Sequence, residues 1–348
     1  MTILIYGATG FTGRLCAHEA VRRNAKVVLA GRSAEKIATI GQQTGLDTRV
    51  FDLSDPVAID NALDDISTVL HIAGPFSATA DPMVQSCLRT KTNYLDITGE
   101  IGVFEAHAKL DAAAKQQEIM IMSGVGFDVV PTDCLATYVK QQLPDATDLV
   151  IGVSGMSTMT RGTTKSGIEG IRFGTRIRRN GEIIQSPKSQ VKILNFGQGV
   201  RPVVGMSWGD VSTAWYSTKI PNISVYFEAS KQFEMIAKLG GFSRWILGTT
   251  LVQKLLKNKA DKMPEGPTEK QMREVSMHLV AIVTNAAGKS FTATMKTPEA
   301  YSFTAKLALE VALRTDGGFA KQGFQTPAMV FGPDFVTEFA GVERVDVI

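Results

Sequence analysis

The sequence is poor in cysteine and nearly balanced in charge. Its three cysteines, Cys16, Cys87 and Cys134, are far apart and in no metal-ligand spacing. We therefore expect neither a disulfide framework nor a cysteine-based metal site, and we interpret them as buried, reduced thiols of an intracellular protein. The net charge is only +3, and no block of Lys and Arg is interleaved with aromatic residues. Nucleic acid is therefore not an expected partner.

Long uncharged apolar runs and a basic leader are also missing. A transmembrane helix needs about 18 apolar residues, and the nearest candidate, residues 236–256, is interrupted by Lys238, Arg244 and Lys254. Because the chain starts directly with an apolar segment, we expect a cytoplasmic protein. What is present suffices for substantial cores, since 44% of the 348 residues are hydrophobic. This length predicts one large domain or, as we favour, two.

Three glycines at three-residue spacing form the most informative stretch. Gly7, Gly10 and Gly13 lie between an apolar run at residues 3–6 and a segment of helical pattern that begins near Thr12. In such a strand–loop–helix unit, Gly7 would allow the tight turn, Gly10 the close approach of a pyrophosphate, and Gly13 the packing of the helix. The N–H groups of the first helical turn would face the anion. The spacing is not that of the commonest dinucleotide motif, so its place between strand and helix carries the prediction.

Residues 1–130 alternate between strand-like and helix-like patterns. Strands are expected at residues 3–6, 26–30, 48–51, 68–73, 94–97 and 119–122. This alternation is typical of an α/β fold with a doubly wound parallel sheet. Ligands of such sheets bind beyond the carboxyl ends of the strands, so the residues that follow each strand are the binding candidates.

The end of the second strand predicts which nucleotide is bound. Arg32 and Ser33 occupy the place where an NAD-selective site usually has an acid for the ribose 2′-hydroxyl. A guanidinium and a hydroxyl suit a 2′-phosphate instead, which predicts NADPH. The alternative is that Arg32 caps a loop in solvent.

Two later strand ends add candidates with alternatives. Asp52 follows the third strand, where it would either contact adenine or cap the next turn. Ala73, Gly74 and Pro75 follow the fourth strand, where small residues would let the chain pass the nicotinamide ribose. A Gly–Pro turn is, however, also an ordinary way to end a strand.

After about residue 130 the pattern becomes that of an α+β domain with a mostly antiparallel sheet. Residues 203–227 are expected in this sheet, residues 275–295 as a hairpin, and residues 158–165 as a hydroxyl-rich loop. A helix is expected at residues 301–314, followed by a tail at residues 317–348 with turns and at most one short helix.

Residues 231–257 are apolar and basic, and three interpretations stay open. The segment would form helices packed on the sheet, a lid over an apolar substrate channel, or a surface that touches a membrane. The pattern alone does not choose among them.

Five blocks of the sequence together resemble the saccharopine-dehydrogenase-like oxidoreductases, especially the branch of trans-acting enoyl reductases. The blocks are GATGFTGRL at 7–15, AGRSAEKI at 30–37, AGPF at 73–76, NYLDITGE at 93–100 and GVGFDVVPTD at 124–133. A weaker block, GFQTPA, lies at 323–328. The resemblance is specific over about the first 135 residues, and the central part of the chain resembles the family only loosely.

The resemblance implies a fold and a cofactor. It implies an NADP-binding Rossmann domain at residues 1–140, to which residues 301–348 return, and an α+β substrate and dimerisation domain at residues 141–300. A homodimer through the central sheet is a further implication. The predicted cofactor contacts are Gly7, Thr9, Gly10, Phe11, Thr12, Gly13, Arg32, Ser33, Asp52, Ala73, Gly74 and Pro75.

For the enoyl reductase branch, the implied chemistry is hydride delivery to a C=C bond of a hydrophobic acyl substrate. We therefore expect an NADP-dependent, enoyl-reductase-like oxidoreductase. One alternative is C–N chemistry of the saccharopine type, which needs several arginines around a carboxylate. The arginines that leave it open are Arg161, Arg172, Arg176, Arg178 and Arg179. The other alternative is a non-catalytic, lipid-associated NADPH-binding module.

A proton donor is expected at a strand end, because the cofactor itself carries the hydride. Glu100 and Asp128 lie at such ends and are the catalytic candidates. Each has an alternative role, since Glu100 would bridge to a cation and Asp128 would fix a loop. Tyr94 begins its strand and is interpreted as structural. No Tyr-x-x-x-Lys pair stands where a short-chain dehydrogenase needs it, and no metal site is expected.

Overall fold

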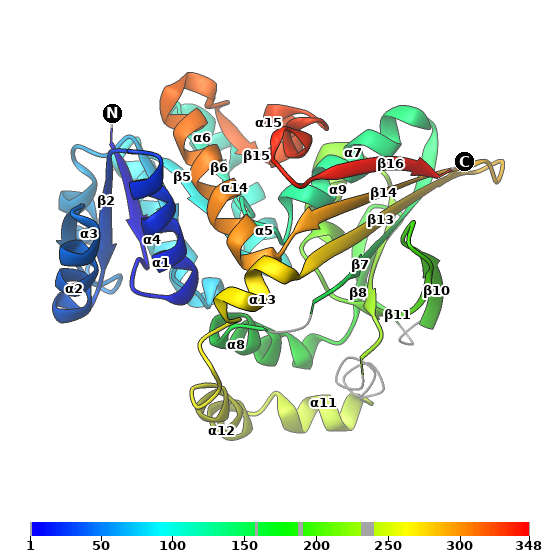
Figure 1. Ribbon diagram of the computed structural model, residues 1–348, viewed down its shortest axis with the longest axis horizontal. Helices are drawn as coiled ribbons and strands as arrows, with labels where there is room; N and C mark the ends of the chain where they lie inside the picture. The colour runs from blue at the N-terminus through cyan, green and yellow to red at the C-terminus, as the bar shows by residue number, and fades with distance from the viewer. Residues whose placement is uncertain (1, 157–158, 187–190, 231–239, 348) are drawn as a thin grey trace. The chain divides into compact units, whose positions relative to one another are not determined.

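The computed structural model describes residues 2–156, 159–186, 191–230 and 240–347. The chain divides into two compact units (Figure 1). The first consists of Met1–Val130 with Tyr301–Val330, and the second of Pro131–Ala300 with Phe331–Ile348. The helix after residue 130 and residues 331–348 thus belong to the second unit, whereas the family resemblance implied that they belong to the first.

Seven strands form a parallel sheet in the first unit, in the order β15-β6-β5-β4-β1-β2-β3. They are β1 (Ile3–Tyr6), β2 (Val27–Gly31), β3 (Asp47–Val50), β4 (Thr68–His71), β5 (Asn93–Asp96), β6 (Met120–Met122) and β15 (Gly323–Gln325). β1 pairs with β2 on one side and β4 on the other, and all its residues are buried. A strand covered on both faces is apolar throughout, which explains its unbroken apolar sequence. The predicted doubly wound sheet is confirmed.

The chain winds outward from β1 in two directions. β1, β2 and β3 lead to one edge of the sheet, and β4, β5 and β6 lead toward the other. Because parallel crossovers are right-handed, the helices of the two halves cover opposite faces, and α1 indeed contacts α2 while α3 contacts α4. The helices are α1 (Phe11–Arg22), α2 (Ala34–Thr44), α3 (Pro56–Leu63), α4 (Phe76–Thr90), α5 (Ile101–Ala108), α6 (Asp111–Gln116) and α14 (Ala300–Arg314). The direction changes between β1 and β4, the place where such sheets bind ligands.

α14 joins the first unit from far along the chain, as the predicted helix at residues 301–314. Glu310 of α14 pairs with Arg23 at the end of α1 at 2.6 Å. A π-helical turn (Thr315–Phe319) follows, and β15 then extends the sheet beside β6. The prediction that the tail holds no strand was therefore wrong.

The second sheet has nine strands, with the order β10-β11-β12-β7-β13-β14-β16 and with β8 and β9 attached at β12. They are β7 (Ala146–Ser154), β8 (Arg176–Arg179), β9 (Glu182–Gln185), β10 (Val191–Asn195), β11 (Val200–Met206), β12 (Asn222–Glu228), β13 (Ser276–Asn285), β14 (Ser290–Pro298) and β16 (Glu343–Val347). β12 and β7 pair in parallel and the other neighbours antiparallel. The predicted mostly antiparallel sheet and the β13–β14 hairpin are confirmed.

The helices around the second sheet correct two predictions. They are α7 (Val130–Gln142), α8 (Arg161–Gly170), α9 (Asp210–Thr218), α11 (Gly241–Leu247), α12 (Thr250–Ala260) and α13 (Glu269–Glu274), with 3-10 turns at Ile171–Phe173 and Phe335–Glu338. The short helix α15 (Pro327–Phe331) belongs to the first unit except for its last residue. α8 occupies most of the predicted loop, because the Thr160 hydroxyl accepts from the Thr163 N–H at 3.1 Å and caps a helix. α9 interrupts the strand predicted at residues 203–227. The helical prediction for residues 231–257 holds in α11 and α12, and residues 231–239 lie outside the described chain.

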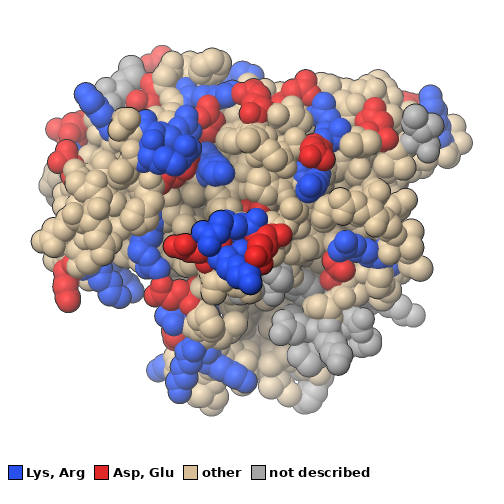
Figure 2. Space-filling model, in the orientation of Figure 1, with Lys and Arg blue, Asp and Glu red and all other residues tan. Residues whose placement is uncertain are grey.

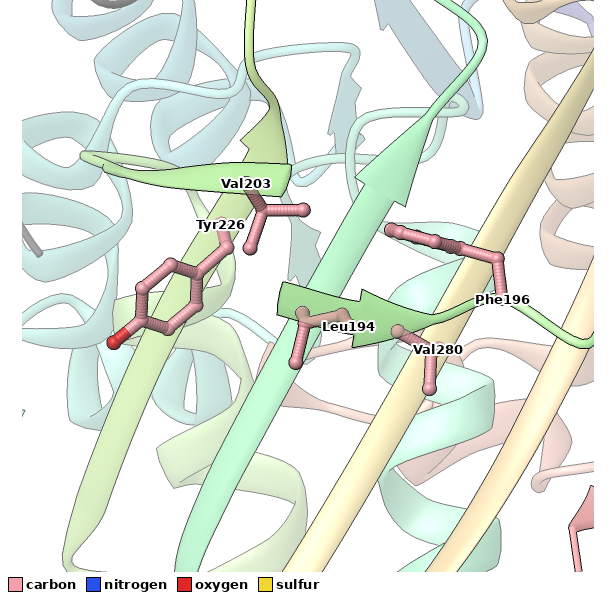
Figure 3. Close-up of a cluster of buried hydrophobic side chains, with 5 residues drawn as sticks. All are labelled: Leu194, Phe196, Val203, Tyr226 and Val280. Atoms are coloured by element: carbon pink, nitrogen blue, oxygen red, sulfur yellow. The ribbon is translucent and has the colours of Figure 1, made fainter. Parts of the chain in front are cut away.

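The core of the second unit includes a cluster where β10 and β11 fold over β7. Its buried members are Leu194, Phe196, Val203, Tyr226 and Val280 (Figure 3). β7 has a glycine at this place, Gly152. A Cβ there would lie 2.7 Å from Cγ1 of Val280 and 2.8 Å from Cδ1 of Leu194. The glycine therefore gives the hairpin room to pack.

Two expectations from the composition, on the cysteines and on membrane-spanning helices, can be compared with the structure. The three cysteines are buried free thiols, as predicted. Across the described ranges, no helix combines the length and the apolar character needed to cross a membrane.

Candidate functional site

Two glycines shape the loop between β1 and α1. Gly7 has a φ of +92°, and a Cβ on it would lie 2.8 Å from the backbone N of Ala73. A Cβ on Gly13 would lie 2.2 Å from the carbonyl oxygen of Gly7. Gly7 thus brings the end of β1 against the end of β4, and Gly13 brings α1 against the loop, in agreement with their predicted structural roles.

Unlike Gly7 and Gly13, Gly10 is not required by close packing within the protein. In the described chain, the nearest atom to a Cβ on Gly10 would be the Gly7 carbonyl oxygen at 3.4 Å, so the protein's own packing leaves room there. Gly10 is the N-cap of α1 and, as a glycine, has no side chain to cap it. The first N–H groups of a helix have no intrahelical acceptor, and with the helix dipole they attract an anion. The N-terminus of α1 is lined by backbone at Gly10 and has no capping side chain among the described residues. A pyrophosphate could therefore bind there, beside Thr9, Phe11 and Thr12.

The ends of β1, β2 and β3 meet beside this loop. Arg32 is exposed directly after β2, and within the described chain the Ser33 hydroxyl makes no capping bond to α2. Burial and the charge of Asp52 raise the pKa of Tyr6 to about 12, and the charge of Arg32 opposes this shift. The guanidinium is therefore close to the end of β1. A cation and a hydroxyl at this point fit a 2′-phosphate.

Asp52 closes a turn at the same edge. Its Oδ1 accepts from the Ser54 N–H at 2.9 Å. Hydrogen bonds from Ser54 and, to a smaller extent, the charge of Arg32 lower the pKa of Asp52. This supports the turn-capping interpretation, and a contact with adenine stays a prediction.

Glu100 holds the loop that follows β4. Its two carboxylate oxygens accept from the N–H groups of Phe76 and Ser77 at 3.0 and 2.9 Å, which caps α4. The Thr79 hydroxyl donates to the carbonyl of Ala73 at 2.5 Å. The segment with Gly74 and Pro75 is thus held from both sides, so Glu100 positions backbone, and its catalytic role stays a prediction.

A buried carboxylate that sequence reasoning missed joins the ends of β5 and β6. Oδ1 of Asp96 accepts from the N–H groups of Thr98 and Gly124 at 2.9 and 3.0 Å. Its Oδ2 accepts from the hydroxyls of Tyr94 and Ser123 at 2.9 and 3.0 Å. Burial raises the pKa of Asp96 to about 6, and these four hydrogen bonds oppose the shift. The signal that could have revealed Asp96 was an acidic residue inside a mostly buried strand. The Tyr94 hydroxyl donates to this carboxylate, which agrees with the structural role expected for Tyr94.

Asp128 lies in the loop after β6, against the loop after β5. A Cβ on Gly99 would lie 2.9 Å from Oδ2 of Asp128, so the glycine makes room for the carboxyl group. Desolvation raises the pKa of Asp128 to about 7. A carboxyl group with a raised pKa retains its proton closer to neutral pH than an ordinary aspartate does, which is what a general acid needs. Asp128 therefore has suitable chemistry, and its catalytic role stays a prediction.

Two residues of α14 also contact these loops and were missed. The rings of Tyr301 and Phe11 pack edge to face, with centroids 5.8 Å apart. Oγ1 of Thr304 accepts from the Phe127 N–H at 3.0 Å. The only sequence feature that pointed to this part of the chain was the weaker block GFQTPA at residues 323–328.

Nothing in the described ranges suggests a metal centre, since no three His, Cys, Asp or Glu side chains gather there in a group that could hold an ion. The arrangement instead defines a class of protein. A doubly wound parallel sheet with an open helix start at its switch point is a dinucleotide-binding domain.

The family of this domain follows from comparison. Residues 3–122 match the family model of the saccharopine dehydrogenase NADP-binding domain. This part of the chain belongs to that domain family, and the predictions of the family and of NADP(H) as cofactor are confirmed.

Full-length relatives extend beyond the matched region. A trans-acting enoyl reductase of Mycobacterium leprae is 35% identical over 142 residues, which are 38% of this chain and 33% of that protein. A saccharopine dehydrogenase-like oxidoreductase of Rattus norvegicus is 28% identical over 163 residues, 40% of this chain and 38% of that protein. The chain thus covers between a third and two fifths of the length of these relatives.

A solved structure shares the fold over the whole chain. It is apo saccharopine dehydrogenase (L-Glu forming) from Saccharomyces cerevisiae, with a TM-score of 0.65, 12% identity and 100% of both chains covered. At this identity the likeness concerns the fold alone.

Proposed function

We propose that this protein is an NADPH-dependent oxidoreductase that delivers a hydride to a C=C bond of a hydrophobic, enoyl-type acyl substrate. The observation that carries the proposal is the place of Asp128, whose carboxyl group lies against Gly99 at the ends of β6 and β5 of an NADP-binding sheet, where desolvation raises its pKa to about 7. The similarity to trans-acting enoyl reductases over 142 residues supports this reaction.

Reduction of a C=C bond requires a hydride on one carbon and a proton on the other. The hydride would come from the bound cofactor. The start of α1 would hold the pyrophosphate, and Arg32 with Ser33 would hold the 2′-phosphate. Glu100 fixes the loop after β4, and Asp128 would hold a proton at its carboxyl group for transfer to the substrate carbon.

The arginines of the second unit disfavour the C–N alternative. Arg178 is buried and donates to two backbone carbonyls at 2.6 and 2.9 Å. Arg179 faces an aspartate at 3.4 Å, and Arg161 donates to a backbone carbonyl at 2.6 Å. Arg176 stacks on a phenylalanine ring at 4.2 Å, and the side chain of Arg172 is outside the described residues. The four described guanidinium groups, those of Arg161, Arg176, Arg178 and Arg179, are engaged with different partners and so do not support a shared carboxylate pocket.

A substrate screen tests the proposal. NADPH consumption is followed with short- and long-chain enoyl thioesters, cyclic imines and 2-oxo acids, using the wild type, Asp128→Asn and the exposed-acid control Asp64→Asn. We expect consumption with long-chain enoyl thioesters, lost in Asp128→Asn and kept in the control. Turnover of imines, or of 2-oxo acids only when an amine is added, would instead assign C–N chemistry, and tight NADPH binding without any turnover would favour the binding module.

A further inference from the structure

Helices α11 and α12 present large apolar side chains to solvent. Trp245 on α11 is 68% exposed, and Leu251 and Leu255 on α12 are 71% and 60% exposed. The two leucines are four residues apart on one helix, so they share a face. Exposed single apolar residues are common, but two strongly exposed leucines on one helical face, with an exposed tryptophan on the preceding helix, need an explanation.

Lysines flank this apolar face on both sides. At 100° per residue, Lys254 and Lys259 lie on either side of the Leu251 and Leu255 stripe. Both lysines are exposed, and the exposed Lys262 follows just after the helix. Figure 2 shows basic side chains gathered at the lower end of the view, where Figure 1 places α12. The outward face of α12 therefore has two leucines and the exposed Asn258 in the middle and lysines at its borders.

The inner face of α12 is fixed to the rest of the second unit. Ala260 is buried, and the Gln253 side-chain amide donates to the carbonyl of Ile168 in α8 at 2.9 Å. Lys257 pairs with Glu169 of α8. The helix is thus anchored on one side, so the opposite stripe is presented at a defined position rather than on a loose segment.

The acids near α12 leave the cationic character of the outer face intact. Asp261 pairs with Lys165 at 2.6 Å, and Glu169 is engaged by Lys257. Their charges are therefore compensated by cations other than those that border the stripe.

We propose that the outer face of α12, formed by Leu251, Leu255, Lys254 and Lys259, binds an anionic membrane surface, with the exposed Trp245 of the preceding helix α11 as an additional contact. Amphipathic helices with apolar residues on one side and lysines beside them lie in the interface of anionic bilayers, where tryptophan is favoured and each lysine is attracted by the surface potential. A second copy is a poorer occupant, because a two-fold contact would bring the bordering lysines of both copies together. The inference stands independently of the reaction proposed above.

Vesicle co-sedimentation of the full-length chain tests this surface. The lipids are phosphatidylcholine alone and phosphatidylcholine with added phosphatidylglycerol, each at low and high salt. We expect binding to the anionic vesicles, reduced by salt. The pair Leu251→Ser with Leu255→Ser should weaken binding at least about tenfold through lost apolar burial. Lys254→Glu with Lys259→Glu should weaken it at least about tenfold at low salt.

Matched controls come from the first unit. Val57→Ser removes a valine that is 68% exposed on α3, and Lys26→Glu reverses an exposed lysine. Both should bind vesicles as the wild type does, and circular dichroism with NADPH titration confirms that every variant is folded. Absence of vesicle binding, equal binding to neutral vesicles, or equal loss in the controls would overturn the proposal. So would a dimer, seen by analytical ultracentrifugation, that the leucine variant abolishes without any vesicle binding.

Discussion

The two sheets of this protein bring polar side chains together in different ways. In the first unit every strand runs in the same direction, so Gly7, Arg32 and Asp128 reach one edge from three different strands. In the second unit, Ser154 and Glu228 end the parallel pair β7 and β12, and Arg201 reaches them from the antiparallel β11. The Ser154 hydroxyl donates to Glu228 Oε2 at 2.6 Å, and Arg201 lies 3.0 Å from the same oxygen.

The difference concerns what determines where a site lies. A parallel sheet collects all its strand ends at one edge whatever their register, so strand order alone locates the binding edge. In a mixed sheet, clusters depend on which residues are paired across neighbouring strands. Strand order therefore determines where the polar side chains gather in the first unit. In the second unit, the pairing register of neighbouring strands determines it.

The largest expected effect is that of Gly13→Val in the first unit. A Cβ at this position would lie 2.2 Å from the Gly7 carbonyl, so α1 would have to move away from the loop. We expect NADPH binding to weaken by about a thousandfold, or more than about 4 kcal/mol, measured by fluorescence titration. Apart from its chain neighbours and the nearby backbone of α5, no described atom lies within 4 Å of a Cβ on Gly102, so Gly102→Ala is the matched control and should bind normally. Normal binding by folded Gly13→Val would show that the cofactor lies elsewhere.

Next in size is Asp128→Asn. We expect kcat to fall by about 10²–10⁴-fold with the accepted substrate while NADPH affinity is unchanged. The folded pKa of about 7 means that the proton is held below pH 7 and lost above it. The wild-type rate should therefore fall as the pH rises through about 7, and the variant's rate should lack this step. An unchanged pH profile in the variant would assign the proton to another group.

Arg32→Ala should have a smaller effect, on the choice of nucleotide. Loss of a charge-assisted contact costs about 1.5–3 kcal/mol, so NADPH should bind about 10- to 100-fold more weakly. NADH affinity should not change, because NADH has no 2′-phosphate. Isothermal titration with both nucleotides measures this, and Arg22→Ala, an exposed arginine on α1, is the control. An equal loss for both nucleotides would contradict the 2′-phosphate assignment.

The difference between local and long-range contacts explains which features could be predicted from the sequence. The glycine loop depends on neighbours within a few residues, so its place between β1 and α1 could be predicted from spacing alone. The bonds of Asp96 to Gly124 and of Phe127 to Thr304 join residues 28 and 177 positions apart, which no local pattern encodes. β15 and β16 have only three and five residues, which is too short for a clear sequence pattern. They are strands because they pair with β6 and β14, which are far away in the sequence. α9 was missed because an aromatic segment has no clear period, and tertiary packing chose the helix.

The smallest expected effect tests whether the polar cluster of the second unit is only structural. The side chains of Glu228 and Arg201 are 38% and 31% exposed, so their ion pair is worth less than about 1 kcal/mol. Although burial raises the pKa of Glu228, hydrogen bonds from Ser154 and Arg201 lower it overall. A lowered folded pKa stabilises the protein above the unfolded value, and this contribution is lost as the pH falls below about 4. Glu228→Gln should therefore lower stability slightly at pH 7, and the difference from the wild type should shrink in acid, as measured by urea unfolding. If kcat fell a hundredfold or more in a folded Glu228→Gln variant, the second unit would supply a catalytic group, and the cofactor edge would no longer be the sole source of the chemistry.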